Sequence, residues 1–129
     1  MLQLTAGQRI LLAIEPADFR RGIDSLVALC KSELAEDPFE GTVFAFTNRR
    51  KTALKVLVFD GNGFWLIMKR FSKGKLSWWP MDKGEKLEIR AEALHILLAQ
   101  GDPRFMQTPI PWRFVKQNNL PQAVAPTTA

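Results

Sequence analysis

The chain has 129 residues and a net charge of +5, with 47% hydrophobic and 24% charged residues. These values are typical of one soluble globular domain with a core of its own. The single cysteine, Cys30, excludes an intramolecular disulfide, and one cysteine with one histidine, His95, excludes a structural zinc site of the usual kind. No stretch approaches the ~20 apolar residues of a membrane span, and the first residues carry no signal-peptide pattern, so we expect a cytoplasmic protein without a membrane partner.

The first half of the chain predicts a strand, a helix and a second strand. Residues 9–14 are a short candidate for a buried strand, which ends before Pro16. Residues 23–36 place their apolar side chains, Cys30 among them, on one helical face, and the helix should end at Asp37-Pro38. Residues 42–46 are the next candidate strand.

The second half predicts a hairpin, a further strand and a short helix. Asp60-Gly61-Asn62-Gly63 separates apolar runs at 54–59 and 64–68, the second of which continues as a strand to residue 70, and Asn and Gly tolerate the positive φ that tight hairpin turns require. Residues 76–79 would add a strand before a charged loop at 81–86. Residues 91–99 form the last predicted helix, with Gly101 at the C′ position that favours glycine.

Together these elements predict an α+β fold. We expect a mostly antiparallel sheet of about five strands, with one helix packed on a face and a short C-terminal helix. Residues 1–102 form the predicted domain. Residues 103–129 form a proline-rich extension that we expect to be partly flexible, above all over residues 115–129.

Positive charge is concentrated in one part of the chain. Residues 48–79 carry eight Lys or Arg against one acid, Asp60, for a net of +7, whereas the remaining residues sum to −2. Concentrated positive charge favours an anionic partner, of which nucleic acid is the commonest. The cations of the segment are Arg49, Arg50, Lys51, Lys55, Lys69, Arg70, Lys73 and Lys75.

The hairpin register decides how these cations lie. If Asn62-Gly63 is the two-residue loop, Lys55 faces Arg70 across the hairpin, and like charges in that position are unfavourable by ~0.2–1 kcal/mol. An anion between them would relieve the repulsion, which favours a phosphate-binding surface. A Gly61-Asn62 loop would shift every pair. The competing interpretation is a solvated sheet edge whose lysines prevent aggregation.

Three further features are candidate contacts. Arg20 and Arg21 precede a predicted helix and could hold a phosphate at its start; the favoured alternative is that Asp18 or Asp24 caps the helix and the arginines pair with acids nearby. Trp78 and Trp79 are adjacent, so in a strand their side chains would point to opposite faces, and Trp79 is the better candidate for the core.

Two other tryptophans, Trp78 and Trp65, are candidates to stack on a base or contact a partner. Trp78 is equally compatible with packing under the C-terminal segment.

No catalytic constellation is visible in the sequence. The spacing of Asp18, Asp24 and Asp60 does not support a metal-binding triad. Cys30 lies on an apolar stripe and should be an inert core thiol, while His95 should be a surface or boundary residue. The sequence therefore predicts a protein that is not an enzyme and that holds no metal or cofactor.

A series of short motifs resembles one known family. The run D-F-R-R-G-I-D at residues 18–24 precedes a helix and is followed, in order, by F-A-F-T-N-R-R at 44–50, L-K-V-L at 54–57, D-G-N-G-F at 60–64, K-R-F at 69–71, Gly74, Trp79-Pro80 and a leucine-rich helix ending at Gly101. Over residues 4–102 the chain resembles the small accessory protein, often called TnpB, of transposons of the insertion sequence 66 type. The resemblance implies a role in transposition beside a separate DDE-type transposase and a small helix-turn-helix protein; it implies no catalytic residues.

Three functional hypotheses follow. The first is a non-catalytic accessory factor whose basic hairpin binds DNA at transposon ends or in the transposase–DNA complex. The second is an adaptor that docks on the transposase without DNA, through the acidic first helix, the tryptophans and the proline-rich segment 107–112. The third, and the weakest, is a metal-dependent nuclease. The sequence does not indicate an oligomeric state.

Overall fold

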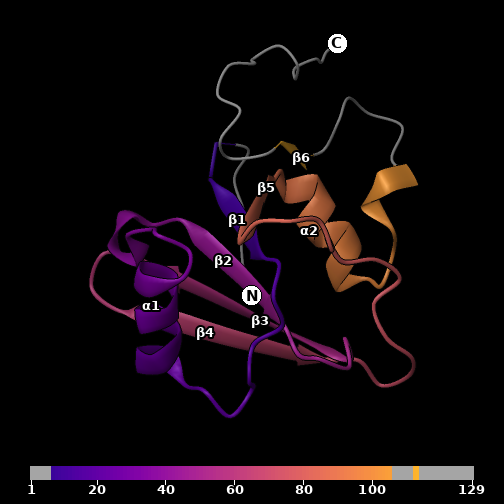
Figure 1. The fold of residues 1–129 in the computed structure, drawn as a ribbon, viewed down its shortest axis with the longest axis horizontal. Coiled ribbons are helices and arrows are strands. Elements are labelled where there is room, and N and C mark those ends of the chain that lie inside the picture. The colour runs from indigo at the N-terminus through magenta and orange to yellow at the C-terminus, as the bar shows by residue number, and fades with distance from the viewer. Residues whose placement is uncertain (1–6, 106–111, 114–129) are drawn as a thin grey trace.

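The computed structural model describes residues 7–105 and the backbone of residues 112–113. Its centre is a six-stranded sheet in the order β4-β3-β2-β1-β5-β6 (Figure 1). The strands are β1 (Ile10–Ala13), β2 (Val43–Thr47), β3 (Ala53–Phe59), β4 (Phe64–Arg70), β5 (Lys86–Ile89) and β6 (Trp112–Arg113). The helices are α1 (Ile23–Ser32) and α2 (Ala91–Leu98), with the short 3-10 helices η1 (Pro38–Glu40) and η2 (Pro103–Phe105).

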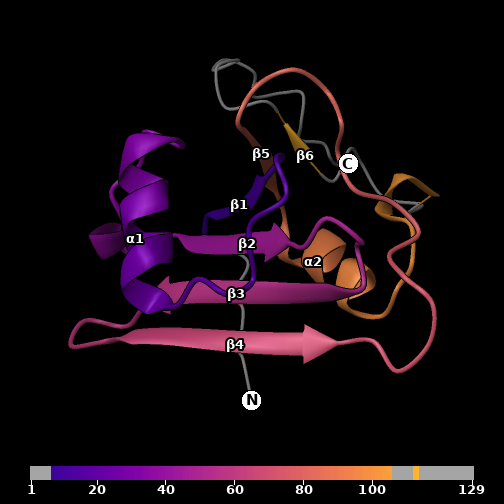
Figure 2. The ribbon, with the colours of Figure 1, turned by 60° about the horizontal axis from the view of Figure 1, so that its bottom comes forward.

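The sheet is antiparallel except for one pair of strands. β1 and β2 run parallel, and α1 lies on the connection between them. The other neighbours pair antiparallel, including the long β3–β4 hairpin at one edge (Figure 2). The α+β class and the mostly antiparallel sheet predicted from the sequence are therefore confirmed.

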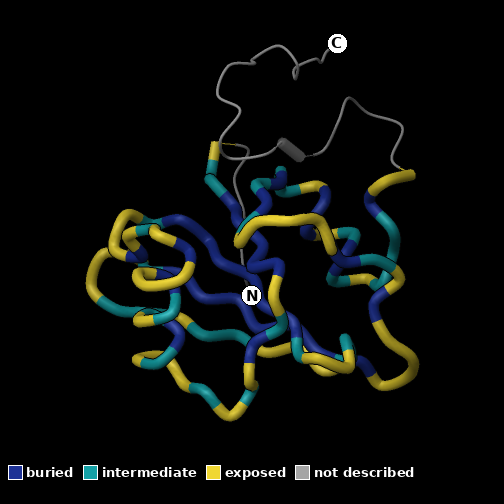
Figure 3. The backbone as a smooth tube through the Cα atoms, in the orientation of Figure 1, coloured by how far each residue is buried: buried dark blue, intermediate teal, exposed yellow. Residues whose placement is uncertain are grey.

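Side chains of the central strands alternate between two cores, one on each face of the sheet. Leu11 of β1 packs with α1 residues such as Leu26 and Cys30 on one face. Ile10 and Leu12 pack on the other face with α2 residues such as Leu94 and Leu97. β1, β2 and most of β3 are buried, whereas exposure is concentrated in the turns and β4 (Figure 3).

The position of the fifth strand differs from the prediction. Residues 76–79 form no strand; instead β5 begins at Lys86, the last residue of the span expected to be a charged loop. Trp79 is buried as expected, but its indole N–H donates to the carbonyl oxygen of Ala13 at 3.1 Å. The apolar residues of this segment therefore pack in the core without pairing with a strand of the sheet.

The predicted helices both exist, with earlier ends. α1 ends at Ser32 rather than at residue 36, and Ala35 takes a positive φ of 54°. α2 ends at Leu98, and the left-handed position after it is held by Gln100, whose φ is 64°, not by Gly101. Gly101 is one residue further along, where its N–H donates to the carbonyl oxygen of Ile96 at 2.8 Å.

The predicted hairpin exists, and it takes the second of the two registers considered from the sequence. Gly61-Asn62 forms the loop: the N–H of Asp60 donates to the carbonyl oxygen of Gly63 at 3.0 Å, and Gly61 has a φ of 108°. Lys55 therefore pairs with Met68, and Arg70 pairs with Ala53. The like-charge pair expected between Lys55 and Arg70 does not form.

The predicted C-terminal extension lies mostly outside the described residues. This applies to residues 106–111 and 114–129, and thus to the expected flexible tail and to most of the proline-rich segment. Of the extension, the structure describes η2 and the backbone of β6, which pairs with β5.

Candidate nucleic-acid interface

The turn between β2 and β3 is held by the side chain of Asn48. Its Oδ1 accepts the N–H of Thr52 at 2.9 Å, and its Nδ2 donates to the hydroxyl of Thr52 at 2.9 Å. Lys51 completes the turn with a positive φ of 61°. These bonds fix a tight turn whose tip carries Arg49 and Arg50, both exposed.

The loop after β4 lies against this turn. The N–H of Phe71 donates to Thr52 O at 3.0 Å, and that of Leu76 donates to Lys51 O at 2.8 Å. From the other side, Nε2 of Gln100 donates to the carbonyl oxygens of Lys73 and Lys75, at 2.9 and 3.2 Å. Two segments about twenty residues apart in sequence thus become one surface.

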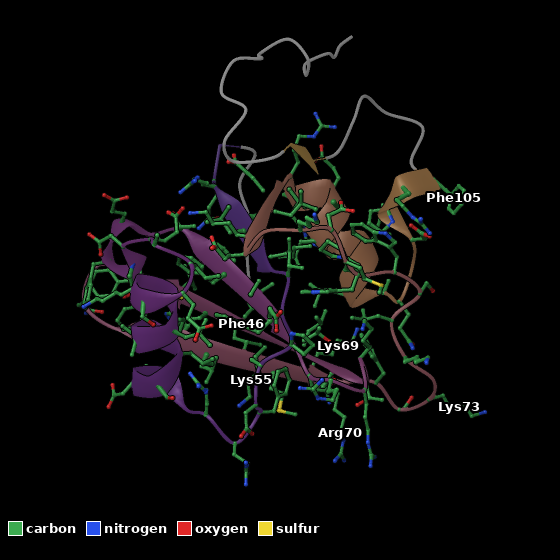
Figure 4. The ribbon with its side chains drawn as sticks, viewed as in Figure 1. Phe46, Lys55, Lys69, Arg70, Lys73 and Phe105 are labelled. Carbon is green, nitrogen blue, oxygen red and sulfur yellow. The ribbon has the colours of Figure 1, made fainter. Side chains whose placement is uncertain are left out.

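We call this surface the basic end. It consists of Arg49, Arg50, Lys51, Arg70, Lys73 and Lys75. All but the half-buried Lys51 are exposed, and Figure 4 shows Arg70 and Lys73 at the outer end of the hairpin. The one acid of residues 48–79, Asp60, lies in the β3–β4 turn at the opposite end of the same strands. The hairpin is therefore polarised along its length.

Lys55, which the sequence placed on this surface, lies elsewhere. Lys55 is only 8% exposed, and its Nζ donates to the carbonyl oxygens of Phe19 and Arg21, at 2.8 and 2.9 Å. The ammonium also lies 5.0 Å from the ring centroid of Phe19. Burial and these bonds give Lys55 a structural role, so we exclude it from the candidate interface.

Lys69 also has an internal partner. Nζ donates to the carbonyl oxygen of Leu98 at 2.7 Å, at the C-terminal end of α2, where a cation is favoured by the helix dipole. The side chain points to the α2 face of the sheet, opposite to that of Arg70, because neighbours in a strand alternate. Lys69 thus joins β4 to α2 and stands beside the basic end rather than within it.

Arg20 and Arg21 meet Arg49 and Arg50 around one hollow of about 590 Å³. The same hollow is lined by four acids, so it carries no excess of positive charge; they are Glu15, Asp18, Glu33 and Glu85. The hollow thus places two further arginines beside the basic end, but it adds no net positive charge.

Asp18 and Arg20 form an ion pair of 2.7 Å at the rim of this hollow. The side-chain and backbone hydrogen bonds from Arg20 hold the pKa of Asp18 well below its usual range. The pairing of Arg20 with a neighbouring acid is confirmed, but neither aspartate caps α1, whose N-cap is Gly22 without a side-chain bond. Arg21 and the two turn arginines remain the better candidates for an external anion.

The two tryptophans of the candidate set differ in their surroundings. Trp65 is 59% exposed on β4, and its indole N–H donates to Asp60 at 2.7 Å. Trp78 is half-buried, packs against the α2-side core, and lies under the guanidinium of Arg104 at 5.7 Å. Trp65 therefore offers the larger surface to a partner.

The described residues contain no group of three His, Cys, Asp or Glu placed to hold a metal ion. Asp60, one member of the triad considered from the sequence, instead accepts the N–H groups of Asn62 and Gly63, both at 3.1 Å. Over residues 7–105 and 112–113, neither helix has the length and apolar content needed to cross a membrane.

Two features of the interface were not predicted from the sequence. Gln100, far from the hairpin in the chain, fixes the loop that carries Lys73 and Lys75, and no local signal indicates this contact. The grouping of Arg20 and Arg21 with Arg49 and Arg50 depends on how α1 lies across the sheet. Both depend on tertiary packing.

Comparison with known proteins gives consistent matches. The family model described as IS66 Orf2-like protein matches residues 8–107. The chain is 37% identical over 99 residues to the uncharacterized protein y4jC of Sinorhizobium fredii, covering 77% of this chain and 84% of that protein. It is 34% identical over 115 residues to the uncharacterized protein y4hO of the same organism, covering 88% and 97%. No solved structure matches the chain significantly.

Proposed function

This chain belongs to the family of IS66 Orf2-like proteins, and from that premise we propose that it assists transposition by holding DNA phosphates at its basic end. The family supplies the coarser part, an accessory role in the transposition of insertion sequences. The partners implied by the resemblance are a DDE-type transposase and a helix-turn-helix protein of the same element. DNA, and transposon ends in particular, is the partner that we add.

The observation that carries the proposal is the joining of the β2–β3 turn to the loop after β4. The bonds Phe71 to Thr52 and Leu76 to Lys51 bring six cations to one end of the hairpin. No acid of residues 48–79 lies there, because Asp60 is at the other end, and the four acids of the hollow come from other segments and line it with Arg49 and Arg50. Like charges held together by backbone bonds repel one another, and a polyanion relieves that repulsion while releasing its own counterions.

The arrangement suits phosphate contact more than base reading. Arginine presents a planar fork that bonds two phosphate oxygens, and Arg49, Arg50 and Arg70 supply three such groups. Sequence reading usually requires an element that enters a groove with Arg, Asn or Gln side chains. The longer of the two α-helices, α1, instead carries Asp24 and ends beside Glu33. We therefore expect affinity with little base preference.

The test is DNA binding by fluorescence anisotropy over a salt series. Wild type should bind a duplex carrying a transposon end and lose affinity steeply as salt rises. Arg70→Ala should lower the slope of log K against log salt by about one, the value of one lost phosphate contact. Lys31→Ala is the charge-matched control, because Lys31 is exposed on α1, away from the basic end; its slope should equal that of wild type.

Two results would overturn the proposal. One is the absence of wild-type binding at about 50 mM salt, where phosphate contacts are strong. The other is an equal loss of slope in both variants, which would mean that the net charge and not the basic end is responsible. In either case the adaptor hypothesis takes precedence, and capture of the purified transposase without DNA becomes the decisive experiment.

A further inference from the structure

β4 is an edge strand whose outer side has no partner in the described part of the chain. The sheet order places β4 at its end, paired only with β3 (Figure 2). Residues 64–68 are apolar and uncharged, and Trp65 and Met68 are 59% and 51% exposed. An exposed, apolar edge of this kind is a template for pairing with another strand.

The hydrogen bonds at the two ends of the hairpin show which backbone groups face outward. Asp60 bonds Gly63 at one end, and Phe71 bonds Thr52 at the other. Bonded and non-bonded residues alternate in an antiparallel pair, so the odd-numbered residues of β4 bond to β3. The outward N–H and C=O groups therefore belong to Phe64, Leu66, Met68 and Arg70.

β4 lacks the usual devices that protect an edge. It pairs with β3 over seven successive residue pairs without a bulge, and it contains no proline. Its two cations, Lys69 and Arg70, stand only at the C-terminal end, so the five residues before them are unprotected. A strand this regular and this apolar is therefore a suitable template for a strand of another chain.

We propose that β4 pairs antiparallel with β4 of a second copy of this chain, joining two sheets in a symmetric dimer. The charge along the hairpin selects this occupant and this direction. A parallel pairing would set Lys69 and Arg70 of both copies side by side. An antiparallel pairing instead places Lys69 and Arg70 of each copy near the β3–β4 turn of the other copy, which carries Asp60. Hydrogen bonds from Asn62 and Trp65 favour the ionised form of this carboxyl group.

The register follows from full overlap of the two strands. All seven residues pair when Phe64 faces Arg70 and Leu66 faces Met68, which matches the outward-facing groups. Ile67 then lies on the two-fold axis opposite its own symmetry mate. The dimer does not require DNA, and it would carry one basic end at each end of the joined β4 pair, with Asp60 of the other copy near Arg70.

The first test measures the mass of the full-length protein by analytical ultracentrifugation without DNA. Wild type should be a dimer at micromolar concentrations. Met68→Pro removes one outward N–H and leaves the β3–β4 bonds intact, so it should raise the dimer dissociation constant about tenfold or more. Met68→Ala retains the N–H and should remain dimeric. Circular dichroism should show the same fold for all three.

The second test probes the register directly. Facing residues in a non-bonded pair have Cα atoms about 4.5 Å apart, within the range that a disulfide spans. Ile67→Cys should therefore form an intermolecular disulfide on mild oxidation, whereas Ser72→Cys, exposed beyond the strand, should not. A wild-type monomer overturns the proposal. So does a dimer that Met68→Pro leaves intact and Ile67→Cys does not cross-link; if the proline variant unfolds, the cross-link alone decides.

Discussion

The Nζ atom of Lys55 donates a hydrogen bond of 2.8 Å to the carbonyl oxygen of Phe19, and a second of 2.9 Å to that of Arg21. Lys55 is on β3, the strand next to the edge strand β4, whereas Phe19 and Arg21 lie in the segment that leads into α1. One buried cation thus attaches the start of α1 to the sheet. The same bonds keep this charge away from the surface where the sequence placed it.

Lys55→Met should therefore destabilise the fold. The substitution keeps most of the apolar stem but leaves two carbonyl oxygens without their charged donor, which costs about 1.5–3 kcal/mol in comparable cases. Urea unfolding followed by circular dichroism measures the loss. Lys73→Met removes the same charge from an exposed loop and should change the free energy of unfolding by less than about 0.5 kcal/mol. Equal stability of the two variants would contradict the structural role of Lys55.

The hairpin shows how far local sequence signals reach. Asp60-Gly61-Asn62-Gly63 predicts a tight turn correctly, but Gly61-Asn62 and Asn62-Gly63 both satisfy its demand for positive φ. The choice depends on the Asp60 carboxylate, which accepts the N–H groups of Asn62 and Gly63. A shift of this kind changes every cross-strand pair, and it is the reason that the expected Lys55–Arg70 contact fails.

The fifth strand shows the opposite limit. K-L-E-I at residues 86–89 alternates as a strand should, but the charges before it indicate a loop that extends to residue 86, while the aromatic residues near Trp79 favour a strand. In the structure Lys86 forms an ion pair with Glu36, which is distant in sequence, and Trp79 is buried in the core. Periodicity and composition indicate the fold class and the concentrated charge. The position of the fifth strand and the burial of Trp79 depend instead on contacts with residues distant in sequence.

Gly101→Ala should destabilise the end of α2. A Cβ at this position would lie 2.8 Å from Cγ2 of Ile96 and 3.3 Å from its carbonyl oxygen, so the Gly101 N–H bond to that oxygen would be distorted. We expect a loss of about 1–3 kcal/mol, as for overpacked sites. Gly63→Ala is the control, because a Cβ there meets nothing within 4 Å. A melting temperature of Gly101→Ala at or above that of Gly63→Ala would contradict the steric argument.

Cys30 should resist thiol reagents in the folded protein. Its side chain is fully buried, and burial, followed by the negative charge of Glu36, raises the pKa of the thiol to about 12. The thiolate is the reactive form, so iodoacetamide at mildly alkaline pH should label the protein only after denaturant is added. Mass spectrometry of samples quenched over time measures this. Rapid labelling of the native protein would mean that the α1-side core opens readily.

Glu36 should make the stability of the fold dependent on pH. Its carboxylate bonds Arg9 at 2.7 Å and also bonds Lys86, which joins the segment after α1 to the segment before β1 and to β5. Burial raises the pKa of Glu36, but the hydrogen bonds and charges of Arg9 and Lys86 outweigh it, so the pKa lies below its ordinary value of 4.5.

A carboxyl whose pKa is lowered by folding stabilises the protein above the unfolded-state pKa, and this contribution is lost as pH falls through the folded-state value. Glu36→Gln should therefore be less stable than wild type near neutral pH, by about 1–3 kcal/mol. The difference should narrow as the pH falls below about 4.5. Urea unfolding at a series of pH values measures it, with the exposed Glu33→Gln as the control. A difference between Glu36→Gln and wild type that stays constant into the acid range would show that packing, and not the ionised carboxylate, accounts for the loss.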